Sequence, residues 1–338
     1  MDVNRPGALV ISLDFELLWG VRDLYPSNGG TYRANVLGAR AAIPKMLDLF
    51  TDYDVAATWA PVGMLFASSR DELARFSPSV RPHYIDRGLD PYADPGGDSE
   101  GADPLRFAPS LLRQIAATPR QEIGSHTFAH YYPLEPGHDA ASFRADLDAA
   151  VAIGQAFGVR PRSLVIPRNQ LDFDYLPIIG EAGFTSVRGN QRGWPHRACP
   201  NAEFRRPAAR IRRLIDAYLP TTGDQVIAWD DVPVISGVAC IPASHFLRPV
   251  SARLRRLEPL RFERLRATIE RAAQRGGICH LWWHPHNFGV EQTENLAFLR
   301  RLLDVQQTCA AKYGMKSLTM EDVAASLSPI NLDRATAR

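Results

Sequence analysis

The feature that most constrains the fold is a regular alternation of two kinds of segment. Seven short stretches are apolar and rich in β-branched residues, and amphipathic helical patterns lie between most of them. The stretches cover residues 8–15, 55–63, 121–128, 163–167, 184–189, 236–244 and 276–285. Strands that are apolar on both faces predict a parallel sheet covered by helices. With seven such strands, we expect an α/β barrel rather than an open sheet.

Two further segments define the organisation of the chain. A helical pattern begins near Asp139 or Ser142 and ends at Gly158. Residues 77–109 are rich in Pro, Gly and Asp and show no periodicity, which predicts a long loop. Because long loops in compact domains are often functional, this one is a candidate lid. We expect residues 1–330 to form a single catalytic domain with this loop inserted.

The charge of the chain is nearly balanced but unusual in kind. The formal net charge of +2 gives no reason to expect a nucleic-acid partner. Of the 39 basic residues only Lys45, Lys312 and Lys316 are lysines, so almost all positive charge is arginine. Arginine suits phosphate or carboxylate recognition, and codon bias gives the same excess without function. The clusters at 205–213 and 248–266 are thus candidate phosphate contacts or solvated helix faces.

The cysteines and the apolar runs bear on the cellular compartment. Cys199, Cys240, Cys279 and Cys309 are widely spaced without a CxxC pair, which argues against a zinc ribbon or a disulfide scaffold. They are typical of buried thiols in a reducing compartment. The first residues lack a secretory signal, and no apolar run reaches roughly 18 residues. We therefore expect a cytoplasmic protein without a membrane span.

The sharpest chemical signal is HTFAH, in which His126 and His130 are four residues apart. On one helical turn this spacing would place both imidazoles on one face, as a divalent metal site requires. The motif also lies at the end of a predicted strand, where active sites of parallel-sheet proteins lie. The sequence therefore favours a metal site here.

A second signal is SLDFE at the end of the first predicted strand. The two-residue period of a strand directs Asp14 and Glu16 to the same face, toward the barrel interior. Two buried carboxylates are costly unless they bind a cation, pair with arginine or transfer protons. One could complete the metal site while the other acts as a base, and a structural salt bridge is the alternative.

Two motifs after later strands add candidates. In IPRNQ, Arg168 could orient a carboxylate base through a forked hydrogen bond or be a plain surface charge. In WWHPHNF, His284 and His286 follow Trp282 and Trp283 at the end of a very apolar strand. Either histidine could be a general acid, because its charge changes near neutral pH.

The ordered set SLDFE, HTFAH, PRNQ and WWHPH resembles the NodB-type polysaccharide deacetylases, carbohydrate esterase family 4. The resemblance spans about residues 8 to 290. It implies a distorted (β/α)7 barrel that removes N-acetyl groups from amino sugars. The family's first motif is usually TFDDG, and here Phe15 stands in place of its second Asp.

The resemblance also implies a metal centre. His126 and His130 match the two imidazole ligands of the family's divalent cation, which we expect to be zinc. Glu16 is the nearby carboxylate that could replace the missing Asp as the third ligand. Whether Asp14 or Glu16 is that ligand stays open at this point.

The remaining catalytic roles are carried over in the same way. Asp14 matches the base, Arg168 resembles the arginine that orients it, and His284 resembles the late catalytic histidine that protonates the departing amine. Asp216 and Asp230 are both candidates for the carboxylate that partners His284.

The expected substrate is an N-acetylated amino sugar, nucleotide- or lipid-linked, used in glycan biosynthesis. Trp19, Trp194, Trp282 and Trp283 could stack on its ring, with His286 as a further contact, and buried packing is the alternative for each tryptophan. Whether the chain forms a homo-oligomer stays open. Two other functions are considered, a cyclic amide or ureide hydrolase of the same fold and an inactive sugar-binding homologue.

Overall fold

Seven parallel strands surround the centre of the molecule in the computed structural model, which describes residues 5–26, 28–93 and 96–327. Each lies within one of the seven predicted stretches. They are β1 (Ala8–Phe15), β2 (Ala57–Pro61), β3 (Gln121–Ile123), β4 (Ser163–Leu164), β5 (Ser186–Gly189), β7 (Val238–Pro242) and β9 (Ile278–Trp283). All eight residues of β1 are buried, which explains why its sequence is apolar on both faces.

The strands form two ladders that together make a distorted barrel. One sheet has the order β3-β2-β1-β9-β8, in which β8 is His245–Phe246. The other has the order β4-β5-β7-β6, in which β6 is Val234–Ile235. A parallel bridge between Ser125 and Leu164 continues the ladder from β3 to β4. On the other side, the Ser244 amide, just after β7, donates to the His280 carbonyl of β9 over 2.8 Å. The predicted distorted (β/α)7 barrel of the NodB type is therefore confirmed.

Three short strands escape the sequence patterns. They are β6 (Val234–Ile235), β8 (His245–Phe246) and β10 (Lys316–Leu318). β6 pairs antiparallel with β7, whereas β8 and β10 pair parallel with β9 and β1. Two or three residues are too few to show a period, so only tertiary pairing defines these strands.

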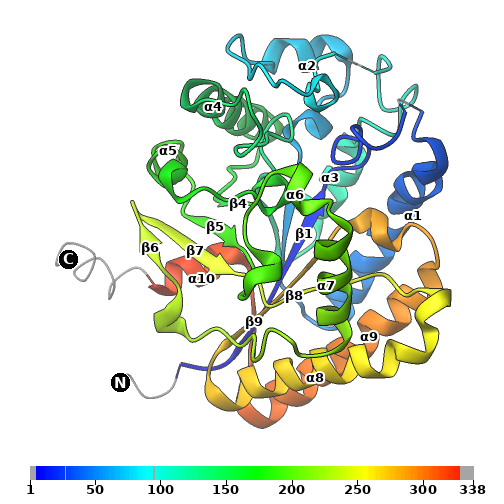
Figure 1. Ribbon diagram of the computed structural model, residues 1–338, viewed down its shortest axis with the longest axis vertical. Helices are drawn as coiled ribbons and strands as arrows, with labels where there is room; N and C mark the ends of the chain where they lie inside the picture. The colour runs from blue at the N-terminus through cyan, green and yellow to red at the C-terminus, as the bar shows by residue number, and fades with distance from the viewer. Residues whose placement is uncertain (1–4, 27, 94–95, 328–338) are drawn as a thin grey trace.

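Helices cover the outside of the barrel, and Figure 1 shows α8 and α9 side by side below β1. The helices are α1 (Arg33–Asp52), α2 (Arg70–Phe76), α3 (Pro109–Ala117), α4 (Ala140–Phe157), α5 (Leu176–Glu181), α6 (Asn201–Phe204), α7 (Pro207–Tyr218), α8 (Glu258–Arg275), α9 (Gln292–Tyr313) and α10 (Met320–Leu327). In the part of the chain that the structure describes, none is long and apolar enough to cross a membrane.

The ends of α4 agree with the sequence prediction. The Asp139 carboxylate accepts a hydrogen bond from the Ser142 amide over 2.8 Å and caps the first turn. Gly158 ends the helix in the left-handed conformation, with φ of 95°. The four cysteines are buried and free, as predicted.

The long segment between α2 and α3 packs beside the barrel mouth. Its described residues form neither α-helix nor strand, but a short 3-10 turn covers Arg87–Leu89. The His83 and Ile85 amides donate to the carbonyls of Gly137 and Pro136 over 2.9 and 3.0 Å. The loop is therefore anchored to the segment that follows HTFAH. Its role as a lid stays a prediction.

Candidate active site

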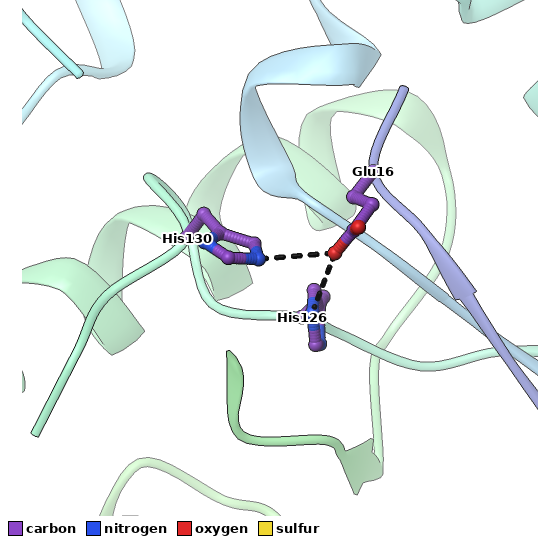
Figure 2. Close-up of side chains that lie close together, drawn as sticks. All are labelled: Glu16, His126 and His130. Carbon is purple, nitrogen blue, oxygen red and sulfur yellow. Dashed lines mark hydrogen bonds and ion pairs between the residues drawn. The ribbon is translucent and has the colours of Figure 1, made fainter. Parts of the chain in front are cut away.

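Three buried side chains meet at the carboxyl ends of β1 and β3 (Figure 2). The Glu16 Oε2 atom lies 3.0 Å from His130 Nε2 and 3.3 Å from His126 Nε2. One donor atom from each of the three residues lies within 4.8 Å of the other two. The structure thus brings together the three residues that the sequence predicts as metal ligands.

The two histidines converge through a loop and not through the helical turn that the spacing suggested. Thr127 and His130 have left-handed φ angles of 62° and 55°, which no α-helix contains. The buried Asp146 carboxylate of α4 accepts hydrogen bonds from the Phe128 and Ala129 amides over 2.7 and 3.0 Å. The loop therefore folds around this carboxylate, and its two imidazoles point into the barrel mouth.

Glu16 depends on a glycine one turn further along the chain. The Trp19 amide donates to the Glu16 carbonyl over 3.0 Å and closes this turn. A Cβ atom on Gly20 would lie 1.9 Å from the Glu16 carboxyl carbon, so a larger residue would displace the carboxylate. The absence of a side chain at position 20 creates the space that Glu16 fills.

These donors fit a divalent cation. His126 Nδ1 donates to the Val165 carbonyl over 2.8 Å, which leaves Nε2 as the atom that faces Glu16. This buried Nε2 atom has no hydrogen-bond partner among the described residues. Burial also lowers the pKa of His130 to about 3, so its ring is neutral as a metal ligand must be. Two imidazole nitrogens and a carboxylate oxygen form the donor set of a catalytic zinc site.

The predicted base, Asp14, is held by an arginine that the sequence analysis missed. Arg188 of β5 donates to both Asp14 carboxylate oxygens, over 2.5 and 2.7 Å. Burial alone would raise the pKa of Asp14, but the charge and hydrogen bonds of Arg188, together with smaller contributions from nearby histidines, hold this pKa below its ordinary value. The sequence could have identified Arg188, because it is a charged residue at the end of an apolar strand, as in SLDFE.

Arg168 does not make the contact that was predicted for it. Its guanidinium donates to the Asp23 carboxylate over 2.8 Å and to the Gly20 carbonyl over 3.2 Å, not to Asp14. Arg168 has a left-handed φ of 57° in the turn after β4, which changes the direction of its side chain. The arginine that orients Asp14 is Arg188, and Arg168 supports the turn that contains Gly20.

His284 lies between the two carboxylates of the first motif. Its Nε2 atom is 3.7 Å from Asp14 Oδ2 and 3.6 Å from Glu16 Oε1. Its Nδ1 atom is 3.3 Å from the Asn287 Oδ1 atom. The side chain is 23% exposed, so it also reaches the open side of the site. The role of His284 as a general acid stays a prediction.

Neither predicted carboxylate partner of His284 is correct. Asp216 on α7 accepts hydrogen bonds from four other side chains, those of His196, Thr221, Thr222 and Arg264. Asp230 is an exposed residue in a 3-10 turn. The acceptor beside His284 is the Asn287 amide oxygen, which lies three residues away in the same turn.

A cavity of about 200 Å³ opens beside His284. Trp282, His196 and Phe246 are among the residues that line it. The Arg188 guanidinium lies 4.2 Å from the centre of the Trp282 ring, so this tryptophan connects the cavity wall to the Asp14 pair. Trp282 is therefore the tryptophan that is placed to contact a substrate.

Two tryptophans predicted to bind substrate belong to the core. Trp19 is 2% exposed and donates its indole N–H to the Arg106 carbonyl over 2.9 Å. Trp283 is fully buried and stacks on Phe288 with 5.6 Å between ring centres. Successive residues of β9 point to opposite faces, so Trp282 and Trp283 have different surroundings. Neither buried ring can stack on a sugar.

The other two predicted substrate contacts differ from each other. Trp194 is 51% exposed and lies under the Arg212 guanidinium, 4.5 Å from its ring centre. His286 is buried, stacks on His284 with 4.9 Å between ring centres, and has Nε2 3.9 Å from Glu16 Oε1. His286 thus packs against His284 and Glu16 as a buried neighbour of the site. Substrate binding by Trp194 stays a prediction.

Comparisons with known proteins agree with this geometry. The family model described as polysaccharide deacetylase matches residues 35–187, which include both histidines of HTFAH. No curated protein matches the sequence. A solved structure described as a polysaccharide deacetylase from Mycobacterium smegmatis has 14% identity and a TM-score of 0.60, and covers 100% of this chain and 93% of its own.

Two further solved structures have the same fold. A probable polysaccharide deacetylase from Pseudomonas aeruginosa PAO1 has 15% identity and a TM-score of 0.55, over 94% of this chain and 89% of its own. The Puue allantoinase also has 15% identity and a TM-score of 0.55, over 96% and 93%. The family model over residues 35–187 and the shared fold over nearly the whole chain confirm the predicted resemblance to the polysaccharide deacetylases.

Proposed function

We propose that this chain is a metal-dependent hydrolase that removes an N-acetyl or other N-acyl group from an amino sugar in glycan biosynthesis. The observation that carries the proposal is the meeting of three metal donors with Asp14 and with His284, which lines the adjoining cavity. The family match supports hydrolysis, and the residues fit each step of amide hydrolysis.

Glu16, His126 and His130 would hold a divalent cation, with zinc as the expected ion. When bound, it supplies Lewis-acid polarisation of the acyl carbonyl and of a water molecule. The chain itself supplies the proton transfers. Asp14 is ionised beside Arg188 and accepts the proton of the attacking water, whose oxygen bonds to the acyl carbon.

His284 completes the reaction by protonating the leaving group. As the carbon–nitrogen bond breaks, protonated His284 donates its Nε2 proton to the departing amine. The Asn287 oxygen near Nδ1 fixes the ring orientation, so Nε2 faces the reacting groups. Arg188 keeps the Asp14 carboxylate in place during both transfers.

The test compares Asp14→Asn with Asp231→Asn, a change in an exposed ion pair with Arg192. We expect Asp14→Asn to retain the metal and to lose acetate release from N-acetylglucosamine oligomers by about two orders of magnitude or more. Asp231→Asn should match the wild type. Loss of metal from Asp14→Asn would instead make Asp14 a ligand, and unchanged activity would overturn its role as base.

A cyclic amide or ureide hydrolase is the second candidate function, because the allantoinase shares the fold. Turnover of a cyclic ureide without turnover of any N-acetyl sugar would favour it. Binding of sugars without any hydrolysis would indicate the inactive homologue. The cytoplasmic location, the homo-oligomer and the nucleotide or lipid linkage of the sugar stay predictions.

A further inference from the structure

Only some of the arginines around the cavity beside His284 are paired with a carboxylate. Five line the cavity: Arg168, Arg197, Arg213, Arg248 and Arg261. Three of them form ion pairs, Arg168 with Asp23, Arg197 with Glu203 and Arg261 with Glu258. The Asp216 carboxylate on the same wall is already bound by Arg264 and three other side chains. The cavity therefore contains more positive charge than its own carboxylates balance.

Arg213 and Arg248 account for the excess. Arg213 donates to the Phe204 carbonyl and lies 3.9 Å from the centre of the Phe204 ring. Within residues 5–26, 28–93 and 96–327, the Arg248 guanidinium makes no hydrogen bond or ion pair, and Arg213 has no carboxylate partner. Both are half-buried. Burial together with the nearby charge of Arg210 lowers the pKa of each guanidinium, so bringing the two cations together here is costly.

These two arginines lie at the junction of the cavity and a surface groove. Arg168, Phe204, Arg213 and Arg248 line both spaces. The outer groove also has an apolar wall that includes Leu24, Ile211 and Leu214. A ligand can therefore extend from the groove, past both arginines, toward His284.

The junction is formed by the two arginine clusters of the sequence. Cluster 205–213 begins directly after α6 and continues into α7, and cluster 248–266 leads into α8. Figure 1 shows α7 crossing in front of the barrel and reaching α8, where Arg264 donates to the Leu219 carbonyl over 3.0 Å. The fold thus brings together two clusters that are about forty residues apart in the sequence.

We propose that Arg213 and Arg248 form an anion subsite that binds a phosphate group attached to the substrate. Two guanidinium groups that line one junction match the charge and hydrogen-bonding capacity of a phosphate ester. The substrate class is then a phosphate-linked N-acyl amino sugar, whose sugar reaches His284. The assignment of the sugar rests on the proposed function. The phosphate can belong to a nucleoside diphosphate or to a prenyl phosphate.

The experiment measures binding by isothermal titration calorimetry on the full chain, with UDP and farnesyl phosphate as separate probes. We expect at least one probe to bind, and Arg213→Gln and Arg248→Gln each to weaken it about tenfold or more. Arg256→Gln removes the same charge from an exposed position and should leave the dissociation constant unchanged within about twofold. Tighter binding of farnesyl phosphate assigns a lipid source, and tighter binding of UDP assigns a nucleotide.

A charge-retaining variant and the choice of probes make the test decisive. Arg248→Lys should bind more tightly than Arg248→Gln, because it keeps the cation. Binding of neither probe, or equal binding by the wild type and both glutamine variants, would overturn the subsite. The probes contain no acyl group, so their binding is independent of hydrolysis. Absence of acetate release with intact, arginine-dependent probe binding would overturn the proposed function alone.

Discussion

Glu16 and Asp216 are both almost fully buried, but their surroundings differ in kind. Asp216 accepts hydrogen bonds from four side chains, one of which is the permanently charged Arg264. Glu16 faces imidazole nitrogens, and one of these, His126 Nε2, has no hydrogen-bond partner in the described chain. In the described chain the ion-pair partners of Glu16 are all histidines, whereas Asp216 is paired with an arginine. The kind of partner, and not the burial of an acid, therefore distinguishes the candidate metal site from a structural cluster.

The first prediction contrasts the two clusters by their metal content. His126→Ala should reduce bound zinc from about one ion per chain to almost none, and acetate release by roughly two orders of magnitude or more. Asp216→Asn should keep the ion. Plasma mass spectrometry of the purified proteins measures both. Equal zinc content in the wild type, Glu16→Ala, His126→Ala and His130→Ala would show that the ligands are misassigned.

The second prediction contrasts the clusters by stability. Asp216→Ala leaves Arg264 buried without its carboxylate, and should lower the free energy of unfolding by about 3–5 kcal/mol. Asp231→Ala, which breaks the exposed pair with Arg192, should cost about 0–1 kcal/mol. Urea denaturation followed by circular dichroism gives these values. In metal-free protein Glu16→Ala should cost much less than Asp216→Ala, and an equal loss would make Glu16 a structural residue.

The third prediction concerns the space that Glu16 occupies. In Gly20→Ala the new methyl group would overlap the Glu16 carboxylate and move it away from both imidazoles. Zinc affinity should fall by roughly 10- to 100-fold, as for other changes that misplace a ligand. Gly101→Ala is the matched control, because nothing lies within 4 Å of a Cβ at that exposed position. Equal affinities in a competition assay with a chelator would contradict the role of Gly20.

The fourth prediction concerns the part of the folding stability that is lost in acid when Asp216 becomes protonated. Burial opposes its charge, but hydrogen bonds from His196 and Thr221 and the charge of Arg264 hold its pKa below the usual 3.8. The folded state therefore binds a proton less readily than the unfolded chain, and the stabilisation is present above about pH 4 and lost below it. The free energy of unfolding should fall less steeply between about pH 5 and pH 2 in Asp216→Asn than in the wild type. If the free energy of unfolding depends on pH equally in both proteins, Asp216 does not contribute to the acid sensitivity of the fold.

Much of the barrel could be predicted from the sequence, because local patterns and tertiary pairing agree there. β1 is buried throughout and mostly apolar, and α4 has an Asp cap and a terminal glycine. The strand-end rule also brought Asp14, Glu16, the HTFAH histidines and His284 to one place. The loop conformation of HTFAH could not be predicted, because it depends on Asp146, a partner provided by α4.

The wrong residue assignments share one cause. Arg168 and Arg188 follow or end neighbouring strands, and spacing alone does not show which one faces Asp14. In the same way, the two-residue period separates Trp282 from Trp283 without showing which face borders the cavity. In both pairs the choice depends on backbone direction at the end of the strand, which is a tertiary property.

The pairing of β1 has a consequence for the order in which the molecule assembles. The strand that leads to Asp14 and Glu16 pairs with β9 along most of its length and with β10 at its start. These partners are made about 270 and 308 residues later, so β1 is synthesised long before either pairing can form. Contacts of such high sequence separation close slowly. The end of β1 next to Glu16 pairs with β2, which is made before HTFAH, whereas His284 joins the site only after β9 has been made.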